Sequence, residues 1–213
     1  MDPAGRRQVL VNGEERGAES GGLSCFARPC GSLHSAGISI SGANCMGMRF
    51  FASLILAGLL LSTSVVAQPT LSARLLAAHN AERARLRLPP VQWDPVLARS
   101  AASYGPTLAR YGRLQHSPKI SRPGQAESLW MGTRGMFRPE QMVGNWLAER
   151  FDFRPGTFPN VSRSGNWQRV AHYTQIIWPT TTHVGCAIQS SRSWDYLICR
   201  YVPTGNIDGR RVP

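Results

Sequence analysis

Apolar side chains in the middle of the chain recur every three or four positions, which is the period of an amphipathic helix. The first segment with this pattern begins near Thr70 and ends before Pro89. The second covers Val96–Arg110 and follows Asp94, a residue type that caps helix N-termini with its carboxylate. The third covers Arg138–Arg150. The pattern therefore predicts three helices.

Three later segments alternate along the chain and are rich in β-branched and aromatic residues, which is typical of strands. They are Tyr173–Trp178, Val184–Gln189 and Tyr196–Val202, joined by short turns, and they predict an antiparallel meander. Helices followed by strands are the order of an α+β domain. His172 stands at the head of the first strand, behind the long polar segment Asp152–Arg169. Because loops of that length are uncommon unless they are functional, His172 is the first candidate for chemistry.

The first 45 residues do not have the pattern of a domain. They are rich in Gly and Ser, carry scattered charges and show no sustained hydrophobic period. The cysteines among them do not have metal-ligand spacing. We expect residues 1–45 to be disordered or to be an over-extended gene start, with translation beginning at Met46 or Met48. The alternative is a real N-terminal tail followed by a signal anchor.

Residues 46–67 have the parts of a secretory signal peptide. Arg49 precedes the apolar run Phe50–Leu61, and small residues come just before Gln68. The uncharged stretch is short for a membrane span, which needs about 20 apolar residues. We therefore expect a secreted or periplasmic protein whose mature domain is 68–213.

Two cysteines, Cys186 and Cys199, remain in that mature domain, on the second and third predicted strands. An exported protein meets an oxidising compartment, which favours a disulfide. Cysteines on adjacent strands can come within the Cα distance limit of about 7 Å. We expect a disulfide between them, and the alternative is a pair of buried free thiols.

The formal charge of +12, from 24 basic and 12 acidic residues, suggests nucleic-acid binding at first sight. The arginines are scattered, however, and beyond the predicted signal peptide their longest run is Arg210-Arg211. A polyanion-binding face needs basic residues clustered in space. We therefore expect no specific nucleic-acid binding and only weak attraction to anionic surfaces.

Two long motifs resemble those of a known family. His172–Trp178, HYTQIIW, resembles the HYTQ-x-x-W motif of the CAP superfamily (cysteine-rich secretory proteins, antigen 5 and pathogenesis-related 1 proteins, also called SCP domains). Tyr196–Asn206, YLICRYVPTGN, resembles its second motif, and His79–Arg83 resembles its HN-x-x-R motif. In the last motif we expect Asn80 and Arg83 to tie the helix to neighbouring loops. The resemblance implies a secreted member of bacterial type and a three-layer α-β-α sandwich with a central antiparallel sheet.

The resemblance also selects the residues of a central cleft: His116, Glu127, Glu149 and His172, with Gln175 beside them. It implies that the two histidines bind a divalent cation, often zinc. Both histidines and both glutamates of the family pattern are present in this chain.

The segment around Glu127 departs from the family's G-E-N-[LI]-W pattern. It reads AESLW, with Ala126 in place of Gly and Ser128 in place of Asn. The glutamate is retained, but the local turn is in doubt, because glycine permits φ angles that alanine resists.

Such a quartet has a definite chemistry. Neutral imidazole is a common zinc ligand, and two histidines leave coordination positions open for water or a ligand. Zinc lowers the pKa of bound water to about 7, so Glu127 and Glu149 are the candidates for orienting the imidazoles or for catalytic proton transfer. Because lasting zinc sites have three or four protein ligands, two histidines predict weak, exchangeable binding. The alternative is a structural network in which the four side chains satisfy one another.

Three functions follow. The first is an extracellular ligand-binding module with a divalent-metal-binding His/Glu cleft, for a lipid or small molecule, because the resemblance implies a mostly non-catalytic family. The second is a hydrolase driven by metal-activated water, since the sequence has no Ser-His-Asp or Cys-His arrangement and no HExxH motif. The third is a lipid- or sterol-binding protein with an apolar groove, against which stands ordinary core packing of the same residues. The groove residues would be Trp130, Met131, Met136, Phe137 and Trp146.

Overall fold

A computed structural model of the chain describes residues 8–10 and 68–213. The expected signal peptide at 46–67 lies outside the described residues, as does the N-terminal segment apart from residues 8–10. None of the helices in the described part of the chain is long and apolar enough to cross a membrane.

The described residues form helices and a mixed set of strands. The helices are α1 (Leu71–Arg85), α2 (Pro95–Tyr111), α3 (Pro139–Ala148) and α4 (Ala171–Ile176), with the 3₁₀ turns η1 (Lys119–Ser121), η2 (Glu149–Phe151) and η3 (Trp167–Val170). The strands are β1 (Gln8–Leu10), β2 (Gln92–Trp93), β3 (Ala126–Thr133), β4 (Gly156–Thr157), β5 (His183–Ser190), β6 (Trp194–Val202) and β7 (Arg211–Val212).

The main sheet has the strand order β1-β3-β6-β5-β2. Its pairs are antiparallel except at one edge, where β2 runs parallel to β5. A separate two-stranded ribbon pairs β4 with β7. The central sheet is therefore antiparallel, as expected, with one short parallel strand at its edge.

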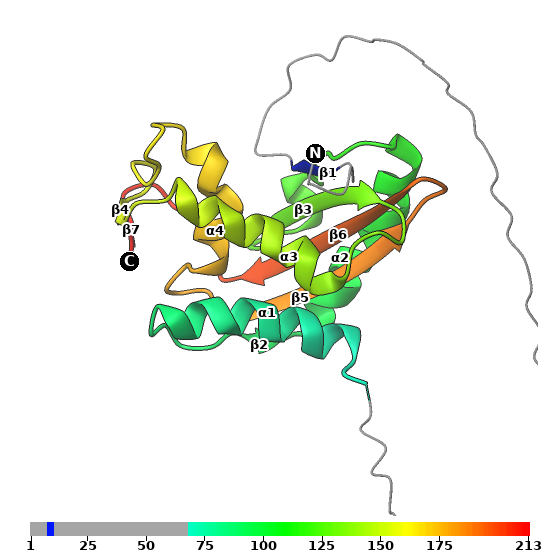
Figure 1. Cartoon of the computed structure of the whole chain (residues 1–213), viewed down its shortest axis with the longest axis horizontal. Helices are drawn as coiled ribbons and strands as arrows, with labels where there is room; N and C mark the ends of the chain where they lie inside the picture. The colour runs from blue at the N-terminus through cyan, green and yellow to red at the C-terminus, as the bar shows by residue number, and fades with distance from the viewer. Residues whose placement is uncertain (1–7, 11–67) are drawn as a thin grey trace, which may run out of the picture. The chain divides into compact units, whose positions relative to one another are not determined.

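Helices cover both faces of this sheet. Leu129 and Ile198 point to one face, where they pack in a core cluster with α2. Their neighbours Trp130 and Leu197 point to the other face, where they join α1, α3 and α4 in a second cluster. Figure 1 shows α3 crossing in front of the strands and α2 behind them. The α+β class and the three-layer α-β-α sandwich are confirmed.

The three predicted helices are present, and two begin at the expected caps. The Thr70 hydroxyl accepts a hydrogen bond from the Ala73 N–H at the start of α1. The Asp94 carboxylate accepts one from the Val96 N–H at the start of α2. The third helix ends at Ala148, two residues before the predicted end, so Glu149 opens the following 3₁₀ turn.

The predicted strand Tyr173–Trp178 is wrong, because this segment forms the short helix α4. Both ends of α4 are satisfied by side chains from distant parts of the chain. The Glu149 carboxylate accepts hydrogen bonds from the N–H groups of His172 and Tyr173. At the other end the Arg83 guanidinium donates to the carbonyls of Ile176 and Trp178. These contacts stabilise a helix that local β-propensity does not favour.

The third long strand of the sheet is instead β3, which the alternation pattern did not single out. It pairs with β6 along its whole length, from Ala126 opposite Tyr201 to Thr133 opposite Trp194. Ala126 lies in this extended strand and is not among the residues with positive φ. The glycine-to-alanine departure at this position therefore costs the backbone nothing.

The expected disulfide is present. Cys186 and Cys199 are directly opposite each other on β5 and β6, with their Cα atoms 4.1 Å apart, and their sulfur atoms are bonded. Both residues are buried in the core on the α1 and α3 side of the sheet. The bond therefore joins β5 to β6 at the residue just before Arg200.

Replacing both cysteines by alanine should lower the free energy of unfolding by about 3 kcal/mol, the value expected for a closed loop of this length. Urea unfolding followed by tryptophan fluorescence would measure it. Wild-type protein in dithiothreitol is the matched control and should lose a similar amount. Equal stability of the oxidised, reduced and double-alanine forms would contradict the prediction.

Candidate functional site

The residues that the family motif selects meet at one cavity of about 330 Å³. It lies at the end of the sheet where β3 begins, and α4 and the loop after β6 form its other walls. His116, Glu127, His172 and Gln175 all line it. Glu149 is not among its lining residues and acts from behind His172. The structure thus brings four of the five cleft residues together in two His/Glu pairs, with Gln175 beside them in the cavity wall.

The first pair joins the loop after α2 to the start of β3. The Nδ1 atom of His116 is 2.7 Å from Oε1 of Glu127. The same carboxylate accepts hydrogen bonds from the N–H and the hydroxyl of Ser117, at 2.9 and 3.0 Å. Nη2 of Arg200, directly opposite on β6, is 3.0 Å from Oε2 of Glu127. Four donors therefore surround a side chain that has no solvent exposure.

Charge keeps Glu127 ionised despite its burial. Burial raises the pKa of this carboxyl group, but the hydrogen bond from His116 and the positive charge of Arg200 outweigh it, so the pKa of Glu127 lies below its usual value. Arg200 is itself almost fully buried, which lowers the pKa of its guanidinium, and it lies 6.0 Å from the ring centroid of Tyr104. A buried pair of this kind is costly to break from either side.

The second pair joins η2 to the first turn of α4. Nδ1 of His172 is 2.6 Å from Oε1 of Glu149. Oε2 of Glu149 accepts hydrogen bonds from the backbone N–H groups of His172 and Tyr173, each at 3.0 Å. The His172 ring stacks on Trp146 of α3, with ring centroids 5.5 Å apart and planes 12° from parallel. The ring is thus fixed both at its edge and on its face.

The hydrogen bond from Nδ1 to a carboxylate has the same consequence in both histidines. A carboxylate oxygen accepts hydrogen bonds, so the Nδ1 atom facing it carries the proton and Nε2 holds the lone pair. Within the described residues neither Nε2 atom, of His116 or of His172, has a hydrogen-bond partner. Both rings line one cavity, and together they form a candidate two-histidine donor set.

The glutamates do not add to that donor set. In residues 8–10 and 68–213 no group of three or more His, Cys, Asp or Glu side chains is arranged to hold a common metal ion. Glu127 already accepts from four donors and Glu149 from three. Their contacts are those of groups that orient the imidazoles.

Gln175 forms part of the wall and is also fully engaged. Its Oε1 accepts the Gly205 N–H at 2.9 Å, and its Nε2 donates to Thr181 at 3.2 Å. A Cβ atom on Gly205 would lie 2.7 Å from that Oε1 and equally close to the Trp178 ring, so only glycine fits there. Gln175 therefore holds the loop after β6 against α4.

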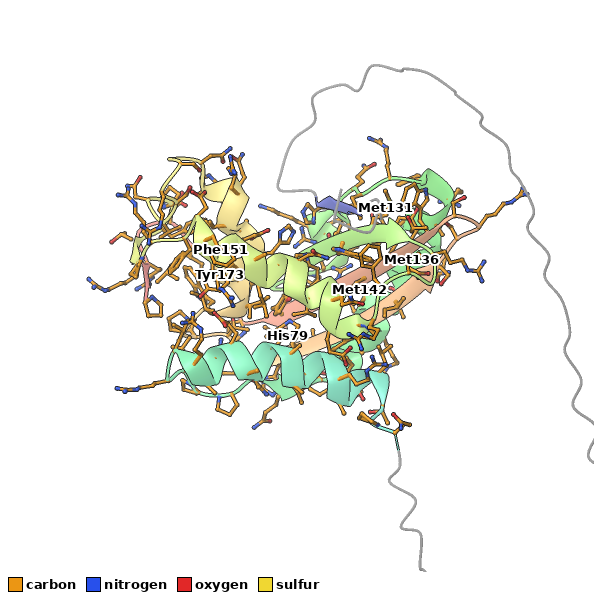
Figure 2. All side chains as sticks on the ribbon, in the orientation of Figure 1. His79, Met131, Met136, Met142, Phe151 and Tyr173 are labelled. Atoms are coloured by element: carbon orange, nitrogen blue, oxygen red, sulfur yellow. A yellow bond between two sulfur atoms is a disulfide. The ribbon has the colours of Figure 1, made fainter. Side chains whose placement is uncertain are left out.

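The HN-x-x-R motif of α1 is structural, as expected. Asn80 exchanges two hydrogen bonds with the backbone of Val91, and Arg83 donates to four carbonyls in the loops before β2 and around the end of α4. His79 points from α1 toward the interior (Figure 2), where its ring nitrogens contact Leu75 O and the Tyr201 hydroxyl. Burial lowers the pKa of His79 to about 4, so it is neutral at physiological pH.

The expected apolar groove is wrong as a single surface, because its residues lie on opposite faces of the sheet. Trp130 and Trp146 are buried in the cluster on the α3 side, whereas Met131 is buried with α2. Met136 is 47% exposed in the turn after β3, and Phe137 packs edge-on against Trp130. These side chains mostly serve ordinary core packing.

Several site residues were missed at the sequence level. Arg200 had a usable signal, because it is a charge within an otherwise apolar strand beside a cysteine. Lys119, Arg122 and Trp167, which also line the cavity, had none, since they sit in irregular segments without a period. Only the folding of distant segments brings them to one place.

Replacing Glu127 by Gln should destabilise the protein by about 3 kcal/mol at neutral pH, because it leaves Arg200 buried without its counter-charge. The pKa of Glu127 is lower in the folded than in the unfolded protein, so its stabilisation is present above its unfolded pKa of about 4.3 and is lost as the pH falls through the folded value. The wild-type and variant unfolding free energies should thus converge in acid, as urea unfolding at several pH values would measure.

The matched control is Glu140→Gln, which breaks the exposed ion pair with Arg74 and should cost less than about 1 kcal/mol. An effect of Glu127→Gln as small as that of the control would contradict the prediction.

Comparisons with known proteins identify the family of this chain. The cysteine-rich secretory protein family, CAP, matches residues 76–201. The chain is 34% identical to a pathogenesis-related protein of PR-1 type from Sambucus nigra over 63% of this chain and 77% of that protein. It is 32% identical to pathogenesis-related protein 1C of Nicotiana tabacum over 78% of this chain and 94% of that protein.

Solved structures share the fold at low sequence identity. The crystal structure of NaASP2 with Zn²⁺ has a TM-score of 0.56 at 22% identity and covers 65% of this chain and 82% of that one. The crystal structure of Na-ASP-1 has a TM-score of 0.57 at 21% identity and covers 72% of this chain and 43% of that one. With the family profile, the relatives and the fold in agreement, this chain belongs to the CAP family of cysteine-rich secretory and pathogenesis-related 1 proteins.

Proposed function

We propose that this protein is a secreted binding module whose cavity takes a small extracellular ligand through a divalent cation held by His116 and His172. One observation carries the proposal: two histidines line the same cavity, each with Nδ1 bound to a buried carboxylate and with no partner at Nε2 among residues 8–10 and 68–213. Carboxylate-oriented imidazoles of this kind are typical of metal-binding histidines.

The donor set fits Zn²⁺ or a similar cation. The Nε2 atoms of His116 and His172 would hold it, and Glu127 and Glu149 would fix the orientation of the two rings. When bound, such a cation acts as a Lewis acid toward a ligand oxygen. Two protein ligands leave coordination positions open, so we expect exchangeable binding in which an external ligand takes part.

Binding is favoured over hydrolysis by the engagement of the carboxylates. A general base must reach the proton that it removes. Glu127 is surrounded by His116, Ser117 and Arg200, and Glu149 by the first turn of α4, so neither carboxylate is free to approach a water molecule in the cavity.

Secretion is supported by the disulfide and by the family. A buried disulfide persists in oxidising compartments, and the family is described as secretory. Residues 46–67 have the composition of a cleaved signal peptide.

Metal-stripped protein should bind Zn²⁺ saturably in calorimetry. His116→Ala and His172→Ala should each weaken the affinity at least about tenfold, and Glu127→Gln and Glu149→Gln should weaken it about 10–100-fold by releasing the rings. His183→Ala, at a histidine on β5 whose ring bonds the Thr182 hydroxyl, is the matched control and should bind as wild type does. Absence of saturable binding by folded wild-type protein would sink the proposal.

Export should yield a mature protein that begins at Gln68. Expression of the full chain with its own leader, followed by intact mass measurement of the exported material, would test this. Peptides from residues 1–45 in that material would contradict cleavage at this position.

A further inference from the structure

The cavity has a charge that its own carboxylates do not balance. Glu127 is paired with Arg200 at 3.0 Å and has a second cation, Arg122, 3.9 Å from its Oε1. Glu149 points its oxygens at His172 and the α4 backbone and does not line the cavity. A divalent cation between the two histidines would therefore meet no free anionic side chain from the described cavity lining.

Two further cations face the same space. Lys119 and Arg122 both line the cavity, from η1 and the residue that follows it. Lys119 is exposed and has no ion pair or hydrogen bond from its side chain within the described residues. Its ammonium group is therefore available to form an ion pair with a ligand in the cavity.

Arg122 is held in place in advance. Its Nε donates to Ser117 O at 3.2 Å and its Nη1 to Gln125 O at 2.7 Å, and its side chain is only 12% exposed. Its Nη2 has no hydrogen-bond partner in the part of the chain that the structure describes. An anchored guanidinium with a free N–H loses little entropy when it binds an oxyanion.

We propose that the ligand of this cavity carries an oxyanion, a carboxylate or a phosphate, which completes the coordination of the cation and is bound by Lys119 and Arg122. This proposal rests on the proposed function and names the ligand class for the same site. The oxyanion supplies the negative charge that Glu127 and Glu149 cannot, because both are already committed to other donors.

An aromatic residue of the cavity lining suits the rest of such a ligand. Trp167, 36% exposed, lines the cavity, and its ring is held edge-on by Phe158 at 5.2 Å between centroids. A volume of about 330 Å³ is at the small end of ligand pockets. The site therefore fits a compact anion with a flat or apolar body, either a free small molecule or the headgroup of an anionic lipid.

Benzoate and phenyl phosphate are suitable probes, with uncharged benzamide as the comparison. Calorimetry on the full protein should give saturable binding of both anions in the Zn²⁺-loaded form and binding at least about tenfold weaker for benzamide. Lys119→Gln and Arg122→Gln should each weaken anion binding about tenfold, the loss expected for one charge-assisted hydrogen bond. Arg192→Gln, an exposed arginine in the turn at the other end of the sheet, should have no effect.

The thermodynamic coupling between Zn²⁺ binding and anion binding supplies a second measurement. Saturating benzoate should tighten Zn²⁺ binding by the same factor by which Zn²⁺ tightens benzoate binding. Without anion, Lys119→Gln and Arg122→Gln should bind Zn²⁺ as tightly as wild type or more tightly, because each removes a positive charge near the cation.

The outcomes separate the two proposals. If wild type binds Zn²⁺ but Lys119→Gln and Arg122→Gln bind the anions as tightly as wild type does, the oxyanion inference is overturned and the proposed metal site is retained. Absence of Zn²⁺ binding would overturn the proposed function, and anion binding equal with and without Zn²⁺ would overturn the claim that the oxyanion completes the coordination.

Vesicles separate the two sources of the oxyanion. Cosedimentation with phosphatidylcholine vesicles containing phosphatidic acid, lost in Lys119→Gln and Arg122→Gln but kept in Arg192→Gln, would identify a lipid headgroup. Binding of the soluble probes alone would identify a free ligand, and absence of both would overturn the inference.

Discussion

The burial of two carboxylates is the constraint on which the rest of the site depends. A carboxylate removed from water must be met by hydrogen bonds or by a counter-charge. Glu127 is met by Arg200, Ser117 and His116, and Glu149 by His172 and the first N–H groups of α4. In each case one of the satisfying groups is a histidine ring. The demand to satisfy a buried charge therefore fixes both imidazoles at the cavity.

The same contacts also build the fold around the cavity. Glu149 supplies acceptors to the start of α4, and Arg83 of α1 supplies donors to its end. The Arg200–Glu127 pair bridges β6 and β3. Loss of any one of these groups would affect stability and site geometry together, so measurements of folding and of ligand binding have to be made side by side on each variant.

The cavity that the two histidines line also carries basic side chains. The negative charge of Glu127 is balanced by the buried Arg200 on the neighbouring strand. Lys119 and Arg122 add positive charge to the cavity lining. Since electrostatic interactions strengthen in partly enclosed sites, this balance of charge is the basis for the proposed oxyanion ligand. Lys119 and Arg122, on which that proposal rests, lie outside the family motifs.

The sequence by itself determined the elements whose residues carry their own local signal. The 3.6-residue period and the caps at Thr70 and Asp94 specify α1 and α2, and alternation specifies β5 and β6, which bring Cys186 and Cys199 together. The likeness of HYTQIIW and YLICRYVPTGN to the CAP motifs supplied the quartet of the cleft. Periodicity alone would have found neither His116 nor Glu127.

Only the tertiary structure decided the form of Tyr173–Trp178 and the roles of the cavity residues. Local propensity favours a strand there, but Arg83, 93 residues before Ile176, and Glu149, 23 residues before His172, satisfy the ends of a helix. The pairing of Arg200 with Glu127 and the approach of Lys119 and Arg122 to the cavity likewise join distant segments. Such interactions have no local period, because they exist only once the sheet and its helices have packed.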